Sequence, residues 1–427
     1  MNTRSFVYIL LIVVLASLGG CFTLPQNNAT SNAVQSKSNA SDFSAMYNPS
    51  SSVVNPQIAT AVLSENDADV FFRIRTQEIK NALANPLDKE FGLYVKYYLR
   101  RADDFHIVDT ASMRFSFNVL DGEYVYGHFK IGIRENIRYK LVVDFVNMQY
   151  NVRKRLLCDI KNTQGFHDGN FMVKTLSGEI LFSNVVRSGQ PIRVFGPRNK
   201  ETVDVEYYAQ KPYVPLSPYW SSSLKSATIP DSVFRYRFGD TISFEAPGLY
   251  ALGSTQKNDK FGIVVTKNLM YPNVTTVADM LEPMKLICTG REYELIDSSS
   301  NTKKSVDAFW LGLSKNEKNA KEQIRVFYSR VALSNMLFAS SDEGWRTDRG
   351  MIYIMLGPPT VVNITPTSEE WSYGSGQQSM VFTFENYSGL RNDFSLLRSN
   401  TYQSIWQQVL ATWRSGKIFT VSKLNNE

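Results

Sequence analysis

One short stretch of the sequence, Asp-Glu-Gly-Trp-Arg-Thr-Asp-Arg, brings together five charged side chains and a tryptophan. Two carboxylates in such a stretch can act as general acid and general base in the hydrolysis of a glycosidic bond. Asp348 with Glu343 or Asp342 would form that pair. Trp345 would then stack against a sugar ring, and Arg349 would bind an anionic group. One hypothesis is therefore a carbohydrate hydrolase.

The same stretch can instead fasten a corner of the fold. Gly344 can take a left-handed turn conformation, and Trp345 can anchor the corner in a seam between a helix and a sheet. Thr347 and Asp348 have short side-chain oxygens that can accept hydrogen bonds from nearby backbone amides. These bonds would satisfy backbone groups that a tight corner leaves unpaired.

The second hypothesis, structural fastening, is favoured. Arg346 or Arg349 can form a bidentate ion pair with Asp348 or Glu343, which would neutralise the charges within the corner itself. No nucleophile motif and no phosphate-binding glycine pattern accompanies the stretch. A charged turn without a nameable reaction partner is more often part of the scaffold than of an active site.

Metal and cofactor sites are not indicated by the remaining residues. His106, His128 and His167 are far apart and show no close ligand spacing. Cys158 and Cys288 fall in segments that we expect to belong to different domains, so a disulfide between them is not expected. The sequence therefore predicts no catalytic residues, no metal and no cofactor.

Composition allows a chain with substantial cores and excludes an obvious nucleic-acid partner. The 427 residues are 43% hydrophobic, which suffices for two or three domains. The formal net charge is +6, but the largest basic cluster is only Arg153-Lys154-Arg155. This charge is too thinly spread for nucleic-acid binding.

The elements that must position the corner begin with two β-rich stretches, residues 58–162 and 163–273. In both, apolar and polar residues alternate with the period of two that half-buried strands require. Examples are Val70, Phe72 and Ile74; Tyr139, Leu141, Val143 and Phe145; and Val203, Val205 and Tyr207. Turn residues separate these runs and no long helix pattern intervenes. We therefore expect two antiparallel β-sandwich domains of immunoglobulin-like (Ig-like) size.

Residues 274–427 show the periodicity of helices and predict an α+β domain. Thr276 can cap a helix from Val277, and residues 317–338 place apolar side chains at three- and four-residue spacing. Short strands are expected at residues 351–356, 370–373, 380–384 and 394–397, before a closing helix at 402–413. Gly357, Pro358 and Pro359 would end the first strand, because proline cannot donate to a sheet ladder.

The pentapeptide Gly344-Trp345-Arg346-Thr347-Asp348 resembles the signature of the GWxTD-domain family. Similar residues occur upstream at Phe309-Trp310, Tyr328 to Ala332 and Asn335, and downstream at Arg349, Gly350, Gly357, Pro358 and Pro359. The resemblance covers about residues 276–400. One departure follows Phe309-Trp310, where the family carries an Arg-Asp-Pro-like turn and this chain reads Leu-Gly-Leu-Ser. The resemblance implies an envelope protein, often a lipoprotein, and it brings no established reaction.

The N-terminus indicates export and a lipid anchor. Arg4 precedes an apolar run from Phe6 to Leu18 that is too short to span a membrane, so residues 1–21 read as a signal peptide. The run ends in Leu18-Gly19-Gly20-Cys21, which resembles a bacterial lipobox and predicts lipidation of Cys21. The alternative is an ordinary signal peptide with an incidental cysteine.

Residues 22–57 are rich in Ser, Asn, Ala and Pro, and we expect a flexible tether there. No acidic residue follows Cys21 closely, which favours the outer membrane with the body of the protein in the periplasm. Three Asp-(Ser/Thr)-apolar triplets, which begin at Asp109, Asp231 and Asp240, resemble O-glycosylation sites of some Bacteroidota.

Two functions are compatible with these observations. The favoured one is a non-catalytic, lipid-anchored envelope protein that binds other envelope proteins in outer-membrane assembly, secretion or transport. The alternative is an enzyme acting on glycan or peptidoglycan, with its site in the C-terminal domain and substrate-binding sandwiches.

Overall fold

The fold is known from a computed structural model, which describes residues 42–420 apart from 63, 65, 84–89, 119–121, 148–151, 163–170, 197–199, 211–213, 221–228, 254–259, 375–378, 387–389 and 391–392. Residues 40–427 form one compact unit. The predicted signal peptide, Cys21 and the first part of the predicted tether lie outside the described residues.

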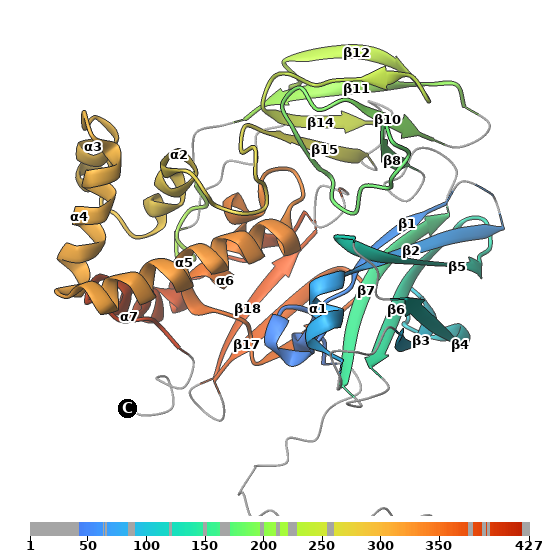
Figure 1. The fold of residues 1–427 in the computed structure, drawn as a ribbon, viewed down its shortest axis with the longest axis horizontal. Helices are drawn as coiled ribbons and strands as arrows, with labels where there is room; N and C mark the ends of the chain where they lie inside the picture. Colours follow the sequence, from blue (N-terminus) through green and yellow to red (C-terminus); the bar gives the residue numbers. More distant parts are fainter. Residues whose placement is uncertain are drawn as a thin grey trace, which may run out of the picture. The chain divides into compact units, whose positions relative to one another are not determined.

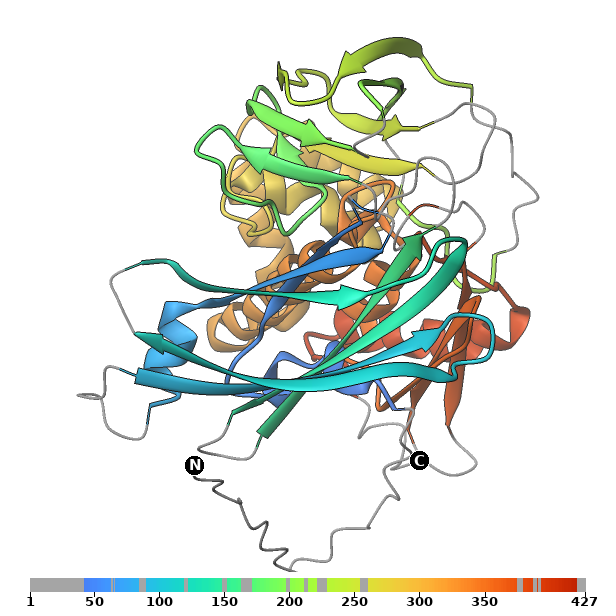
Figure 2. The ribbon, with the colours of Figure 1, turned by 90° about the vertical axis from the view of Figure 1, so that its right-hand side faces the viewer.

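Two antiparallel sheets enclose the first β core (Figures 1 and 2). One has the order β1-β2-β5, with β1 (Gln57–Ala61), β2 (Asp67–Arg75) and β5 (Tyr124–Gly132). The other has the order β4-β3-β6-β7, with β3 (Glu90–Arg101), β4 (Ile107–Asn118), β6 (Ile137–Asn147) and β7 (Val152–Asn162). The predicted alternation is confirmed, because Val70, Phe72 and Ile74 are fully buried while their neighbours on β2 are not. A short helix, α1 (Thr76–Asn81), follows β2.

The second β core also lies between two sheets. The first, in the order β13-β10-β8, contains β8 (Met172–Thr175), β10 (Ile192–Phe195) and β13 (Thr241–Ile242). The second, in the order β12-β11-β14-β15-β9, contains β9 (Val185–Arg187), β11 (Thr202–Ala209), β12 (Ser232–Arg237), β14 (Gly248–Leu252) and β15 (Phe261–Thr266). Among the described strands of these two sheets, only β9 runs parallel to its neighbour, β15.

Helices dominate the C-terminal region and pack beside a fifth sheet (Figure 1). The helices are α2 (Val277–Leu281), α3 (Gly290–Asp297), α4 (Thr302–Ser314), α5 (Glu317–Phe338), α6 (Asp348–Leu356) and α7 (Gln403–Arg414). The sheet has the order β16-β17-β18-β19, with β16 (Val361–Ile364), β17 (Ser368–Tyr373), β18 (Met380–Glu385) and β19 (Ser395–Leu396). The predicted long helix at 317–338 is confirmed with its bounds, and Thr276 caps α2 as predicted.

The strand predicted at residues 351–356 is wrong. This segment lies in α6, and Met351 to Leu356 are all buried. A helix that is apolar on every side cannot be distinguished from a buried strand by periodicity, because neither shows a polar face. The sheet instead begins at β16, which the sequence analysis missed.

The tether predicted to extend to residue 57 is too long. Phe43 and Tyr47 belong to the buried C-terminal core, and two short 3-10 helices, η1 (Ser44–Met46) and η2 (Pro49–Ser51), shape the segment around them. The amide of Phe43 donates to the carbonyl oxygen of Val362 at the start of β16, 2.9 Å away. The composition of residues 22–57 suggested a tether, but the two aromatic side chains of this segment, Phe43 and Tyr47, pack into the core.

The C-terminal core reaches the first β region through this N-terminal segment. Val142 of β6 is part of the same buried cluster as the helices, and Tyr98 and Leu157 pack against it. Lys154 of β7 donates from its ammonium group to the carbonyl oxygens of Ala45 and Asn48, at 2.6 and 3.0 Å. Residues 42–51 are therefore held between β7 and the C-terminal helices.

Candidate functional site

The charged stretch forms a corner, residues 339–350, between helices α5 and α6. After α5 ends at Phe338, a turn leads into one 3-10 turn, η5 (Gly344–Arg346), and α6 begins at Asp348. Thr347 caps α6, because its hydroxyl oxygen accepts a hydrogen bond from the amide of Gly350 at 3.0 Å. The local bonding predicted for Thr347 is thus present, but the corner joins two helices rather than a helix and a strand.

Glycine is required in the corner by close packing. A Cβ atom on Gly344 would lie 1.9 Å from the backbone oxygen of Ser334 on α5, and one on Gly350 would lie 1.9 Å from the backbone oxygen of Gly344. The predicted left-handed conformation of Gly344 is wrong, since its φ is not positive. The two glycines let the corner fold directly onto α5.

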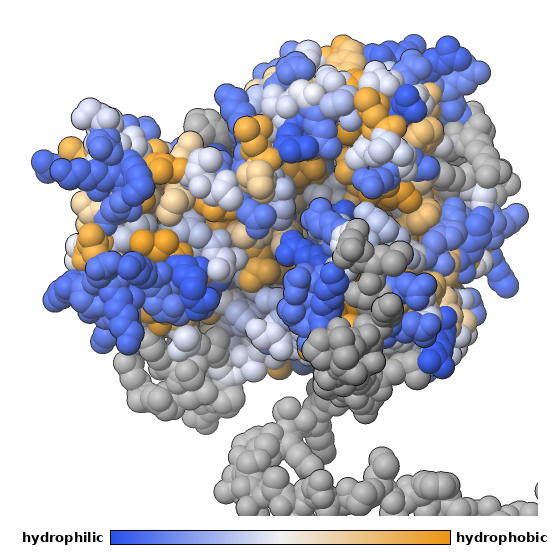
Figure 3. All heavy atoms as spheres, viewed as in Figure 1, coloured by the Kyte–Doolittle hydropathy of each residue, from blue (hydrophilic) through white to orange (hydrophobic). Residues whose placement is uncertain are grey.

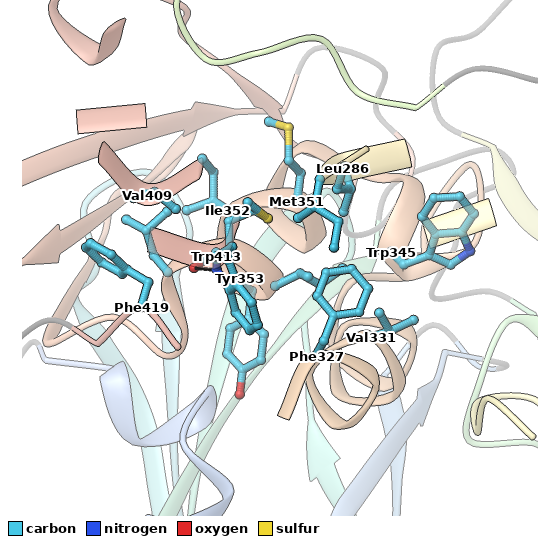
Figure 4. Packing of buried hydrophobic residues seen from close by; sticks show 14 of the residues in the cluster. Leu286, Phe327, Val331, Trp345, Met351, Ile352, Tyr353, Val409, Trp413 and Phe419 are labelled. Atoms are coloured by element: carbon cyan, nitrogen blue, oxygen red, sulfur yellow. Dashed lines mark hydrogen bonds between the residues drawn. The ribbon is translucent and has the colours of Figure 1, made fainter. Parts of the chain in front are cut away.

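Trp345 fixes the corner to the core (Figure 4). Its side chain is 4% exposed, its indole nitrogen donates to Glu343 at 2.8 Å, and its amide donates to the side-chain oxygen of Asn335 on α5 at 3.1 Å. The guanidinium of Arg346 lies 4.4 Å from the centre of its ring. A face covered in this way is not available to stack against a sugar.

Asp348 is fully engaged in holding α6 to the fifth sheet. Its carboxylate pairs with both terminal nitrogens of Arg398, at 2.6 and 3.0 Å, and accepts from the amide of Leu396 on β19 at 2.8 Å. The position at the start of α6 also favours a negative charge. The prediction that Asp348 bonds nearby backbone amides is wrong, because the amide comes from a distant strand, and the arginine is neither Arg346 nor Arg349.

Glu343 and Asp342 contact the second β region. Glu343 accepts from the hydroxyl of Thr266, which is the last residue of β15, and lies 3.6 Å from Arg346. Asp342 accepts from the side-chain amide of Gln210 at 3.1 Å. Burial raises the pKa of the Asp342 carboxyl to about 6, although Arg346, 4.0 Å away, favours its charged form. The prediction that Arg346 pairs with Glu343 is confirmed.

Arg349 lies in a buried network that holds the N-terminal segment. It donates to Glu369 of β17 at 3.0 Å, and the hydroxyl of Tyr47 donates to the same carboxylate at 2.6 Å. Burial, together with the charge of Glu369, raises the pKa of Tyr47 well above its usual value, so the hydroxyl remains a donor. The rings of Phe338 and Phe394 also face the Arg349 guanidinium. Arg349 is enclosed and does not reach an anionic ligand.

The residues after α6 end the helix. Gly357 has φ +90°, and Pro359 is buried beside Pro358, which is half-buried. Arg330 of α5 donates to the carbonyl oxygens of Ile354, Met355 and Phe419, at 3.0, 3.4 and 3.1 Å. Burial lowers the pKa of Arg330 to about 10. Arg330 therefore supplies donors to carbonyls that the end of a helix leaves free.

Sequence reasoning missed the partners of the motif rather than the motif itself. Tyr47, Glu369 and Arg398 are separated from Asp348 and Arg349 by many residues or by other elements, and no spacing rule connects them. Asn335 was noted only as part of the family resemblance. Its side chain in fact joins Trp345 to Pro272, to whose carbonyl oxygen it donates at 3.1 Å.

The side chains of the corner form internal contacts that hold parts of the fold together. Each of its three carboxylates accepts hydrogen bonds from other parts of the unit, and none of residues 342–350 lines the cavity of about 500 Å³ described below. Within the described ranges, no three His, Cys, Asp or Glu side chains gather as a metal site would require. Cys158 and Cys288 are free thiols. No helix in the described part of the chain is long and apolar enough to span a membrane.

Fold and corner together define a sheet-rich protein with a mixed helical and sheet module at its C-terminal end. Residues 248–415 match the family model of the GWxTD domain, as the resemblance of the motif predicted. The matched region begins at β14, earlier than the resemblance at about residues 276–400 suggested. The contact of Glu343 with Thr266 on β15 gives a physical reason for including these strands.

Comparisons with other proteins add little. No curated protein matches the chain. Solved structures with local similarity include a β-glucuronidase of Bacteroides uniformis (14% identity, TM-score 0.19, 27% of this chain and 14% of that one) and a putative β-galactosidase of Bacteroides fragilis (14%, 0.19, 31% and 20%). A red sea bream transglutaminase is also similar (10%, 0.18, 50% and 31%). The chain thus spans less than a third of each of these proteins, and at such TM-scores none of them bears on function.

Proposed function

We propose that this protein is a lipid-anchored envelope protein and a non-catalytic interaction or scaffold component of an outer-membrane assembly, secretion or transport system. In this proposal Cys21 carries the anchor at the outer membrane and the body faces the periplasm. Two Ig-like sandwiches act as spacers or docking surfaces, and the GWxTD domain binds another envelope protein.

The observation that carries the proposal is the engagement of every acid in the corner. Asp348 is held by Arg398, Glu343 by Thr266 and Trp345, and Asp342 by Gln210. A general acid or base must be able to reach a substrate proton, and these groups already have internal partners. Such a corner stabilises a scaffold without providing a reaction.

The contacts of residues 42–51 support a mechanical role. A protein pulled by a lipid anchor needs a firm attachment where the anchored segment joins the folded unit. Tyr47 meets this need through its bond to Glu369, and Tyr353 donates to the carbonyl oxygen of Tyr47 at 2.8 Å. The motif arginine, Arg349, shares this network. In the proposal, the GWxTD motif thus secures the point where the tether enters the folded unit.

A hydrolase acting on glycan or peptidoglycan is the second candidate, and one observation favours it. Asp342 has its pKa raised by burial to about 6, which is a range suited to a general acid. Asp348 would be the second carboxylate. This candidate requires both groups to be released, Asp342 from Gln210 and Asp348 from Arg398, when substrate binds.

An Asp348→Asn variant of the full chain separates the two candidates. We expect its melting temperature to fall, because Arg398 loses its charged partner, with about 2–3 kcal/mol of stability lost. Thermal unfolding in detergent measures this, and turnover of peptidoglycan fragments is assayed in parallel. Unchanged melting together with loss of a measurable hydrolytic activity would favour the enzyme instead. The mass of the mature N-terminal peptide tests the lipid at Cys21.

A further inference from the structure

A groove of about 500 Å³ lies where the two β regions and α5 meet, and the surface is hollowed there (Figure 3). Its walls come from β1 and β7, from residues 180–184, and from the last two turns of α5. All these elements belong to the compact unit of residues 40–427. The first residues of the corner, Ala339 and Ser340, also line the groove, but the acids of the corner do not.

The groove is bordered by two strand edges. β1 pairs with β2 on one side, β7 pairs with β6 on one side, and within the described residues no strand pairs with the other edge of either. Strand edges carry a row of backbone N–H and C=O groups that an extended polypeptide can bond. The side-chain hydroxyl of Thr60 on β1 is also buried without a hydrogen-bond partner. The border of the groove therefore offers mainly backbone donors and acceptors of hydrogen bonds.

The opposite wall is apolar. Leu333 and Leu337 of α5 are half-buried, and Met336 is 40% exposed in the last turn of a helix whose other face is in the core. Phe182, across the groove, is also half-buried. Side chains of an added strand point alternately to two sides, so every second residue would contact this wall.

The charged groups of the groove leave a positive excess. Lys140 pairs with Asp159 at 2.6 Å, and Glu369 is bound to Arg349. Arg73 contacts only the side chain of Gln57 and the rings of Tyr124 and Phe182, with no carboxylate partner among the described residues. An acidic side chain of a ligand would complete this position.

We propose that this groove binds an extended peptide segment of a partner protein, which adds as a strand to the free edge of β1. Its apolar side chains lie against Leu333, Met336 and Leu337, and an acidic residue meets Arg73. The five residues of β1 offer about 17 Å of edge. This inference rests on the proposed interaction function, because it names the kind of partner segment that the protein would take.

The test begins with a phage-displayed library of ten-residue peptides, selected on the full chain in detergent. Selected peptides are synthesised with a fluorescent label, and their Kd is measured by anisotropy. We expect peptides with alternating apolar residues and one acid. Methylating the backbone nitrogens at one set of alternate positions should weaken binding at least tenfold, while the other set should bind nearly unchanged, because only one set faces β1.

Two variants place the binding in the groove. Met336→Lys should weaken binding at least tenfold, while Leu311→Lys, at an exposed apolar position of α4 that does not line the groove, should not. Arg73→Gln should weaken acidic peptides but not their amide analogues. Melting temperatures show that each variant is folded. Failure to select any peptide, equal binding to Met336→Lys, or insensitivity to methylation of both sets would overturn the proposal.

Photocrosslinking in intact cells distinguishes failure of the groove from failure of the interaction function. A photoreactive residue is placed at position 336 or, as a control, at position 311. Crosslinks to an envelope protein from 336 alone support both proposals. Crosslinks from 311 alone retain the interaction function and reject the groove. Tight peptide binding in vitro without crosslinks from either position rejects an envelope partner and retains a peptide site.

Discussion

The corner at residues 339–350 and the groove beside β1 both contain charged and aromatic side chains, but they differ in whether those groups have partners. In the corner, Asp348 and Arg349 are each bound to a side chain of the fifth sheet or its flank. In the groove, no described carboxylate pairs with Arg73, and no described strand pairs with the free edge of β1. The dense cluster of charges in the sequence therefore forms internal contacts of the fold. The residues that line the open groove form no recognisable sequence motif.

The largest effect expected from this comparison is that of Arg349→Met. Removing one partner of a buried ion pair leaves Glu369 charged and enclosed, so the free energy of unfolding should fall by about 3–5 kcal/mol. Thermal or urea unfolding of the full chain in detergent measures the loss. The double variant Arg349→Met, Glu369→Gln should regain part of it. A single variant as stable as the parent would mean that the corner is not a fastening.

The sequence predicted the elements of the molecule better than the contacts between them. The alternation on β2 and the period of α5 follow from one polar and one apolar face, and these predictions were confirmed. The alternation predicted for β6 was not, because Tyr139 to Phe145 are all buried. The segment 351–356 has no polar face, so its helix was not recognised. Motif residues were found because they are contiguous, whereas Tyr47, Glu369 and Arg398 became partners only through folding. Rules that relate residues a few positions apart in the sequence cannot identify partners that are so far apart along the chain.

The next largest loss of stability is expected from a glycine substitution that tests the packing of the corner. In Gly344→Ala the new methyl group would meet the backbone oxygen of Ser334, which cannot move without distorting α5, so we expect a loss of about 3 kcal/mol. Gly312→Ala is the matched control, because a Cβ there has no atom within 4 Å. In the last turn of α4 it should stabilise the helix by about 0.5 kcal/mol. Equal effects of the two substitutions in thermal unfolding would contradict close packing at the corner.

Asp342→Asn should have an effect of opposite sign and should depend on pH. The folded pKa of Asp342 is raised by burial to about 6, so folding favours its protonated form. This stabilisation is complete below pH about 4, the ordinary pKa range of Asp, and is lost as the pH rises through about 6. The variant carries no charge there, and at pH 7.5 we expect it to be about 1–2 kcal/mol more stable than the parent.

Unfolding of the parent and of Asp342→Asn at pH 4.5, 6 and 7.5 checks this sign. The advantage of the variant should grow with pH and level off above about pH 7. A parent protein that gains stability relative to the variant as pH rises would show that the Asp342 charge is favourable in the fold. The pKa of Asp342 would then not be raised in the fold, and the hydrolase candidate would lose the observation that favours it.

The smallest change in stability is expected from a substitution in the groove. This substitution distinguishes the groove from the corner most clearly. Met336 is 40% exposed at the groove wall, so Met336→Lys removes little buried surface, and the long lysine side chain can keep its charge in water. Stability should change by no more than about 0.5 kcal/mol, as for other surface substitutions. The same variant should nevertheless lose peptide binding. A site of fastening loses stability when altered, and a site of binding loses its ligand. A destabilisation by Met336→Lys as large as that of Arg349→Met would mean that the groove wall is part of the core and would remove the difference between the two regions.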